Sequence, residues 1–145
     1  MMHDQVSYRG VVYPWQCDHN GHMNVMWYVS KLDEANWTFI ARLGILKPSY
    51  ASEHRRGMAA LEQRITYRRE VFAGELLEIW SRHVEVREKV VRFVHEMRSS
   101  ETGEVVASCE MAAIHMDRVA RKAIAIPPQI RESALRFIAS PDELP

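Results

Sequence analysis

The sequence predicts an α+β domain in which one long helix covers one face of an antiparallel sheet. Apolar residues recur at three- and four-residue steps between Val25 and Leu43, which is the period of an amphipathic helix. After Met58, four successive segments rich in β-branched and other apolar residues are separated by turn signals, which is typical of strands. One helix followed by a run of strands favours an antiparallel sheet with the helix packed on it.

The length and the charge balance limit the classes of protein to which this sequence can belong. The 145 residues predict a single domain over 1–145. The 19 basic residues balance the 19 acidic ones, which argues against non-specific nucleic-acid binding. No apolar run reaches the length of about 18 residues that a membrane span needs, and Met1–Gln5 does not resemble the start of a signal peptide. We therefore expect a cytoplasmic protein with no membrane span, in which Cys17 and Cys109 are reduced thiols.

The first half of the chain holds one strand and the long helix. A strand is expected from Val6 to Tyr13 and ends at Pro14. Asn24 suits the N-cap of the helix, and Gly44 suits the position just past its end. Residues 49–57 are expected to form a mobile connection. The apolar face of the helix holds Val25, Tyr28, Val29, Leu32, Ala35, Phe39, Ile40 and Leu43, while Lys31, Glu34, Thr38 and Arg42 fall mostly on the other side.

The second half is predicted to be mostly β. Strands are expected over residues 58–69, 75–87, 90–98 and 105–116, in antiparallel succession. Pro127 and Pro128 end the sheet region, and a short helix is expected over residues 129–138. One face of the third of these strands should hold Val91, Phe93, His95 and Met97.

Polar side chains crowd the start of the long helix, in the run Asp18-His19-Asn20-Gly21-His22-Met23-Asn24. A helix start presents free N–H groups and partial positive charge, which suits it to stabilise a developing oxyanion. Asp18 is either a turn carboxylate or a general base or nucleophile beside that site. His22 is either a surface residue or a hydrogen-bond donor. Asn24 is an N-cap and a candidate substrate contact, whereas Tyr28 is either a core residue or a substrate contact.

Other chemistries have weaker signals. Asp18, His19 and His22 invite a metal hypothesis, but no third distant ligand is signalled, so no metal or other cofactor is expected. Neither a Gly-x-Ser-x-Gly elbow nor a glycine-rich phosphate loop is present. Five basic residues are expected to face the solvent, and some of them could bind a phosphate-bearing ligand. These residues are Arg64, Arg68, Arg69, Arg87 and Lys89.

The residues at the helix start resemble a known family. The chain resembles the 4-hydroxybenzoyl-CoA thioesterase-like branch of the hotdog-fold acyl-CoA thioesterases. The resemblance spans about Val6 to Asp117, and the segments that carry it are Tyr13–Asp18, Gly21–Asn24, Tyr28 and Glu34–Ala35. It implies a hotdog fold, an antiparallel sheet wrapped around one long central helix. It also implies hydrolysis of an acyl-CoA without a cofactor, at active sites formed between the subunits of a homodimer or homotetramer.

The resemblance assigns roles to individual residues. It implies that Asp18 is the base or nucleophile, that the backbone N–H near Val25 stabilises the oxyanion, and that His22 and Asn24 complete the loop. Three departures from the family pattern weaken the support of this loop: Gln16, Val25 and Asn36. A non-catalytic acyl-CoA-binding module and a hydroxyacyl-thioester dehydratase remain alternatives. The acyl group, the basic residues that contact CoA, and the choice between base and nucleophile stay open.

Overall fold

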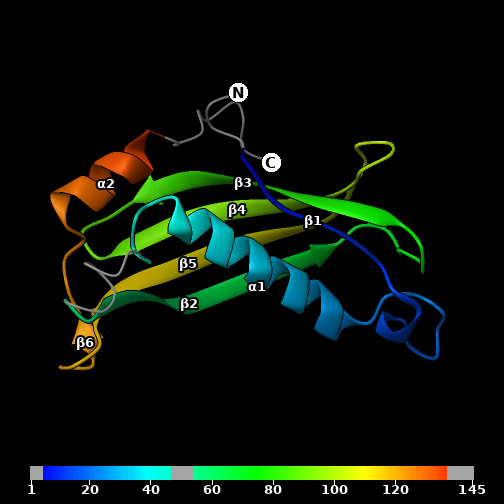
Figure 1. Ribbon diagram of the computed structural model, residues 1–145, viewed down its shortest axis with the longest axis horizontal. Helices are drawn as coiled ribbons and strands as arrows, with labels where there is room; N and C mark the ends of the chain where they lie inside the picture. Colours follow the sequence, from blue (N-terminus) through cyan, green and yellow to red (C-terminus); the bar gives the residue numbers. More distant parts are fainter. Residues whose placement is uncertain (1–4, 47–53, 137–145) are drawn as a thin grey trace.

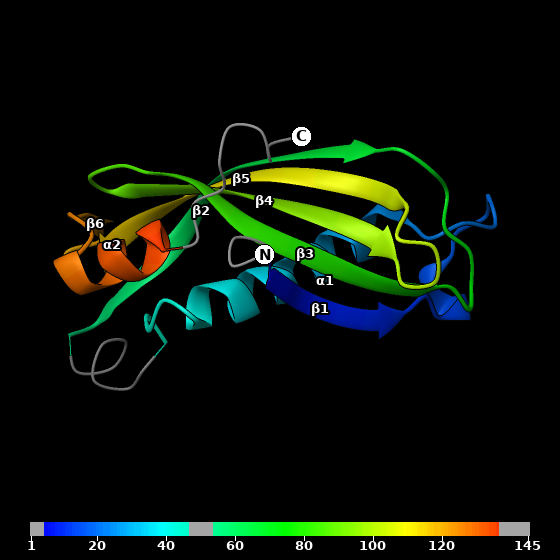
Figure 2. The same cartoon turned by 90° about the horizontal axis from the view of Figure 1, so that it is seen from above.

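The computed structural model describes residues 5–46 and 54–136, which form one curled sheet with a long helix along one face (Figures 1 and 2). The elements, in chain order, are β1 (Gln5–Val11), the 3₁₀ turn η1 (Pro14–Gln16), α1 (Val25–Ala41), β2 (Arg56–Tyr67), β3 (Leu76–Val86), β4 (Val90–Ser99), β5 (Val105–Asp117), β6 (Lys122–Ala123) and α2 (Pro128–Leu135). The α+β class is therefore confirmed. The strands that the sequence predicted are all present, with ends shifted by a few residues, whereas η1 and β6 had no clear signal.

The strands pair antiparallel in the order β1-β3-β4-β5-β2, and β6 adds to β5. Antiparallel succession along the chain holds for β3, β4 and β5 but is wrong for β2. That strand pairs with β5 along its whole length, from Arg56 opposite Asp117 to Tyr67 opposite Ala107. The reason is that α1 carries the chain across the sheet, so β2 begins at the edge farthest from β1 (Figure 1).

Helix α1 begins where the sequence predicts. Asn24 is the N-cap, and its Oδ1 accepts a hydrogen bond of 3.0 Å from the backbone N–H of Met26. The helix ends at Ala41, earlier than the position of Gly44 suggests, because the chain tightens into a turn in which the Gly44 N–H donates to the Ala41 carbonyl. Gly44 itself has φ of 85°, the left-handed conformation expected beyond a helix end.

The core lies between α1 and the middle of the sheet. Leu32 and Phe39 are fully buried, and the Phe39 ring centroid lies 5.2 Å from that of Phe93 on β4. Each such side chain contributes roughly 1.5–3 kcal/mol by leaving water. The expected face of β4 is confirmed, since all four of its predicted members are buried: Val91, Phe93, His95 and Met97.

Three residues of the helix lie on the face opposite to the one predicted. Lys31 is only 4% exposed, although the sequence placed it on the polar side. Its Nζ donates to Tyr8 Oη at 3.0 Å and to the Val11 carbonyl at 3.2 Å, and burial lowers the pKa of Lys31. Val25 and Val29, placed on the apolar face, are exposed. The helix is therefore rotated so that the Lys31 stem, rather than these valines, packs against the β1 side.

A chain of buried polar groups crosses from the sheet to the helix. The fully buried His95 of β4 donates from Nε2 to Asn36 Oδ1 of α1 at 2.7 Å. Its Nδ1 lies 2.5 Å from the Ser81 hydroxyl of β3, which lies 2.6 Å from the Ser7 hydroxyl of β1. Such a chain stabilises a fold only when every member is bonded, so it fixes how α1 sits on β1, β3 and β4. Asn36, a departure from the family pattern, has this role.

The remaining predictions concern the connections. Most of the predicted mobile connection over residues 49–57 lies outside the described residues, but Arg56 and Gly57 belong to β2. The predicted terminal helix is α2, which lies with β6 at the end of the sheet opposite the segment between β1 and α1 (Figure 1). No helix within the described ranges is both long and apolar enough to cross a membrane.

Candidate active site

The segment from Asp18 to Asn24 folds into a tight loop at the start of α1. The Gly21 N–H donates to the Asp18 carbonyl at 2.9 Å, and the Asp18 N–H donates to the His22 carbonyl at 3.0 Å. Gly21 adopts φ of 81°, which a residue with a Cβ rarely tolerates. Cys17 and Met23 pair as an antiparallel bridge below the loop. The loop therefore returns Asp18 to the N-terminus of the helix.

The Asp18 carboxylate is held at both oxygens and is 19% exposed. Oδ1 accepts from the Asn20 backbone N–H at 2.9 Å, and Oδ2 accepts from Asn24 Nδ2 at 3.1 Å. These two bonds, with the nearby His22 and His19, lower the pKa of Asp18 below its ordinary value. The Asn20 bond is the turn role that the sequence allowed. The Asn24 bond adds a link between the carboxylate and the helix start.

Asn24 also leaves one backbone donor of the helix start available. Its Oδ1 accepts from Met26, and its carbonyl accepts from the Trp27 N–H at 2.9 Å. The Val25 N–H has no acceptor among the described residues. An N–H at the first position of a helix carries the positive end of the helix dipole. One asparagine therefore orients the carboxylate while the adjacent donor stays open to a ligand.

His22 lies between two carboxylates. Its Nδ1 donates to Glu70 Oε1 at 2.9 Å, and its Nε2 lies 3.7 Å from Asp18 Oδ2. The sequence did not indicate Glu70, because it follows two arginines beyond β2, far along the chain from His22. Glu70 could have been predicted only by knowing that the segment after β2 packs against the loop, where the Met23 N–H donates to the Val71 carbonyl at 2.9 Å.

The structure brings Asp18, His22, Asn24 and the Val25 N–H together, as the sequence predicts. Tyr28 lies one turn further along α1 and belongs to the core, with its ring edge-on to Tyr67 at 5.0 Å. Burial and the neighbouring Tyr67 raise the pKa of Tyr28 to about 12, so its hydroxyl stays protonated. Its role as a substrate contact stays a prediction.

The two cysteines form no disulfide with each other. Both are free, and burial raises the pKa of the Cys109 thiol to about 12. Within residues 5–46 and 54–136, no three His, Cys, Asp or Glu side chains are placed to hold a metal ion.

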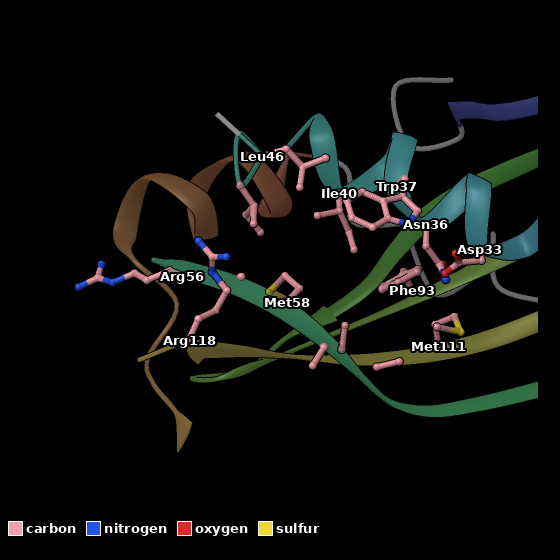
Figure 3. Close-up of a pocket in the computed structure, with 15 residues that line it drawn as sticks. Asp33, Asn36, Trp37, Ile40, Leu46, Arg56, Met58, Phe93, Met111 and Arg118 are labelled. Atoms are coloured by element: carbon pink, nitrogen blue, oxygen red, sulfur yellow. The ribbon is translucent and has the colours of Figure 1, made fainter. Parts of the chain in front are cut away.

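A cavity of about 410 Å³ lies further along α1, between that helix and the start of β2 (Figure 3). Its walls are mostly apolar and include Trp37, Ile40, Met58, Phe93 and Met111. None of the loop residues from Asp18 to Asn24 lines it. Asp33, at its edge, lies about 13.5 Å along the helix axis from Asn24, at 1.5 Å per residue. The carboxylate and the cavity of one chain are therefore separate.

Comparisons with solved structures give the same fold. The hypothetical protein SAV2348 from Staphylococcus aureus, in complex with CoA, has a TM-score of 0.83 at 17% identity, over 92% of this chain and 84% of that one. Slr0204, a 1,4-dihydroxy-2-naphthoyl-CoA thioesterase from Synechocystis, has a TM-score of 0.77 at 13% identity, over 91% of this chain and 96% of that one. The predicted hotdog fold is therefore confirmed.

Sequence comparison identifies the family. A curated relative from Agrobacterium fabrum, "L-carnitine dehydrogenase/betainyl-CoA thioesterase", is 30% identical over 128 residues, which are 88% of this chain and 26% of that protein. This chain thus spans about a quarter of the relative's length. The model of the thioesterase-like superfamily matches residues 12–133. With the match extending from β1's end into α2 and including the whole Asp18 loop, the chain belongs to the thioesterase-like superfamily.

Proposed function

We propose that this protein is an acyl-CoA thioesterase that hydrolyses a thioester to a carboxylic acid and CoA. The observation that carries the proposal is the Asp18 carboxylate, held by Asn24 beside the open Val25 N–H at the start of α1. Its lowered pKa keeps it ionised at neutral pH, as a base or nucleophile must be. The N–H of a helix start suits the oxyanion that forms when a thioester carbonyl is attacked.

The reaction needs only water as a second substrate. As a base, Asp18 takes a proton from the attacking water. The tetrahedral intermediate then expels the CoA thiolate, the carbon–sulfur bond breaks, and the thiolate takes up a proton. As a nucleophile, Asp18 instead attacks the thioester carbonyl carbon, the carbon–sulfur bond breaks, and the CoA thiolate leaves and takes up a proton. Water then hydrolyses the resulting mixed anhydride, which releases the carboxylic acid and regenerates the Asp18 carboxylate. In both routes the Val25 N–H stabilises the oxyanion, and His22 and Asn24 position the carboxylate.

Membership of the superfamily and the names of its relatives support an acyl-CoA substrate. The curated relative is named as a betainyl-CoA thioesterase, and one structural neighbour was solved with CoA. A cytoplasmic location and the absence of a cofactor remain proposals from the sequence. A non-catalytic acyl-CoA-binding module would share the fold, but an ionised carboxylate beside an open N–H has no evident use in a binder.

We further propose that two copies complete each site. Strand β2 lies at the edge of the sheet, and in the described part of the chain its outer side has no partner. A two-fold axis normal to the sheet would pair β2 antiparallel with its copy. The start of one β2, which lines the cavity, would then face the end of the other, where Tyr67 packs on Tyr28. The Asp18 loop of one subunit would lie near the cavity of the other.

The test is Asp18→Asn, which keeps the shape and one acceptor oxygen but removes the charge. We expect kcat towards acyl-CoA substrates, including betainyl-CoA, to fall about 10²–10⁴-fold, as losing a general base typically does. Asp117→Asn is the matched control, because Asp117 also accepts backbone N–H groups and has a lowered pKa, but lies at the far end of β5. Near-normal turnover of Asp18→Asn, or no hydrolysis by the unmodified protein, would refute the proposal.

A further inference from the structure

The cavity between α1 and β2 has one charged group at its helix end. Asp33 and Trp37 lie one turn apart on α1 and both line the cavity, with Phe93 of β4 also in its wall (Figure 3). The Asp33 carboxylate makes no ion pair or hydrogen bond with any residue of the described segments. Trp37 is 60% exposed, although tryptophan is a costly residue to leave in water. An unpaired carboxylate and an open indole therefore share one end of an apolar cavity.

The other polar side chains that line the cavity are either bonded elsewhere or lie at its opposite end. Asn36 turns its Oδ1 to His95, so it is held by the sheet. Arg56 and Arg118 also line the cavity, but Figure 3 shows them at the end away from Asp33. The two ends thus carry opposite charge, negative beside Trp37 and positive at the start of β2. A ligand group that enters between α1 and the apolar walls meets Asp33 and Trp37 together.

We propose that this end of the cavity receives a cationic group, a quaternary ammonium or protonated amine, carried by the acyl part of the thioester. The inference rests on the proposed function and on pairing through β2, which brings the reacting carbonyl of one subunit towards the cavity of the other. A cation gains from an aromatic face and from an opposite charge in a partly enclosed site. A neutral group of the same shape gains neither.

The experiment compares two thioesters of equal shape. Betainyl-CoA (trimethylammonioacetyl-CoA) carries a quaternary nitrogen, and 3,3-dimethylbutyryl-CoA carries a carbon atom in its place. We expect kcat/KM to favour the cationic thioester by about tenfold, and Asp33→Asn to remove most of that preference while leaving hydrolysis of the neutral thioester nearly unchanged. Trp37→Leu should reduce the preference in the same direction. Glu34→Gln is the matched control, since Glu34 is the adjacent helix carboxylate and does not line this cavity.

A binding measurement separates this inference from the proposed function. Titration calorimetry of the Asp18→Asn protein with both thioesters measures the difference in their binding affinity without turnover. If the unmodified protein hydrolyses neither thioester, the same titration can be done with the unmodified protein. Tighter binding of the cationic thioester that Asp33→Asn abolishes supports the inference even when hydrolysis fails. Equal or weaker handling of the cationic thioester by the unmodified protein would overturn it. So would a loss in Asp33→Asn that is the same for both thioesters.

Discussion

His22 has a partner on each side, and each partner limits what the ring can do. Glu70 Oε1 accepts a hydrogen bond of 2.9 Å from His22 Nδ1, which fixes the ring plane and directs Nε2 towards Asp18. Asp18 already receives two other hydrogen bonds, from Asn20 and Asn24. His22 is therefore suited to orient the loop and the substrate rather than to act as the base itself.

This arrangement predicts graded effects of substitution. His22→Ala should lower kcat/KM by about tenfold, less than Asp18→Asn, because it loosens the site without removing its charge. Glu70→Gln should have a smaller effect, since Oε1 can still accept from Nδ1. Steady-state kinetics of the three variants against one acyl-CoA measures the order. A loss in His22→Ala as large as that in Asp18→Asn would instead make His22 part of the proton transfer.

At this scale, local signals in the sequence predict most of the candidate site. Asp18, Asn24 and the Val25 N–H lie within one loop and one helix start, where capping preferences and glycine placement are informative. Glu70 and the Asp33–Trp37 end of the cavity depend on which distant segments meet. Lys31 was misplaced because the position of a helix face depends on how the helix rotates against its sheet, and a long amphipathic side chain can bury its stem on either side.

At the scale of elements, the corner between β5 and β6 depends on a buried imidazole. His115 is fully buried; its Nδ1 lies 3.2 Å from the Ile124 carbonyl, and its carbonyl accepts from the Ile124 N–H at 3.0 Å. Burial lowers the pKa of His115 below its ordinary value of 6.5, so the folded protein holds it neutral.

The folded pKa of His115 lies below the unfolded one, so the unfolded chain binds the proton first. The free energy of unfolding should be fullest above about pH 6.5 and should decrease as pH falls from there towards the folded pKa. Urea denaturation between pH 8 and pH 5 measures this, with His115→Gln as the comparison, which should lack that part of the loss. Asp18 and Asp117, whose pKa values are lowered from 3.8, lose their contribution only at lower pH. An identical decrease in both proteins would contradict this role.

The elements also show why strands are easier to predict than their pairing. The segments forming β3, β4 and β5 follow one another with short turns, and each pairs with the next. β2 looks the same in sequence, but its partner is β5, because the preceding helix sets where the chain re-enters the sheet. Nothing within residues 58–69 distinguishes an edge strand from a central one, apart from the polar run Glu62-Gln63-Arg64.

At the scale of the whole molecule, the outer side of β2 predicts self-association. Leu61 is 58% exposed and Tyr67 is 46% exposed on this strand, and exposed apolar residues on an edge strand are usually covered. Sedimentation velocity at micromolar concentration should show at least a dimer. Leu61→Glu should weaken association, whereas Val119→Glu, at a similarly exposed valine in the β5–β6 turn, should not. A monomer at high concentration would contradict both the dimer and the shared site.

The buried ammonium of Lys31 has a consequence for ionic strength. It joins α1 to β1 through a hydroxyl and a carbonyl rather than through an exposed carboxylate. Dissolved salt screens charges that face water, such as the exposed pair Arg64–Glu110, but reaches a bond inside the protein far less. At high ionic strength, the attachment of the long helix to the first strand should therefore weaken far less than the ion pairs on the surface.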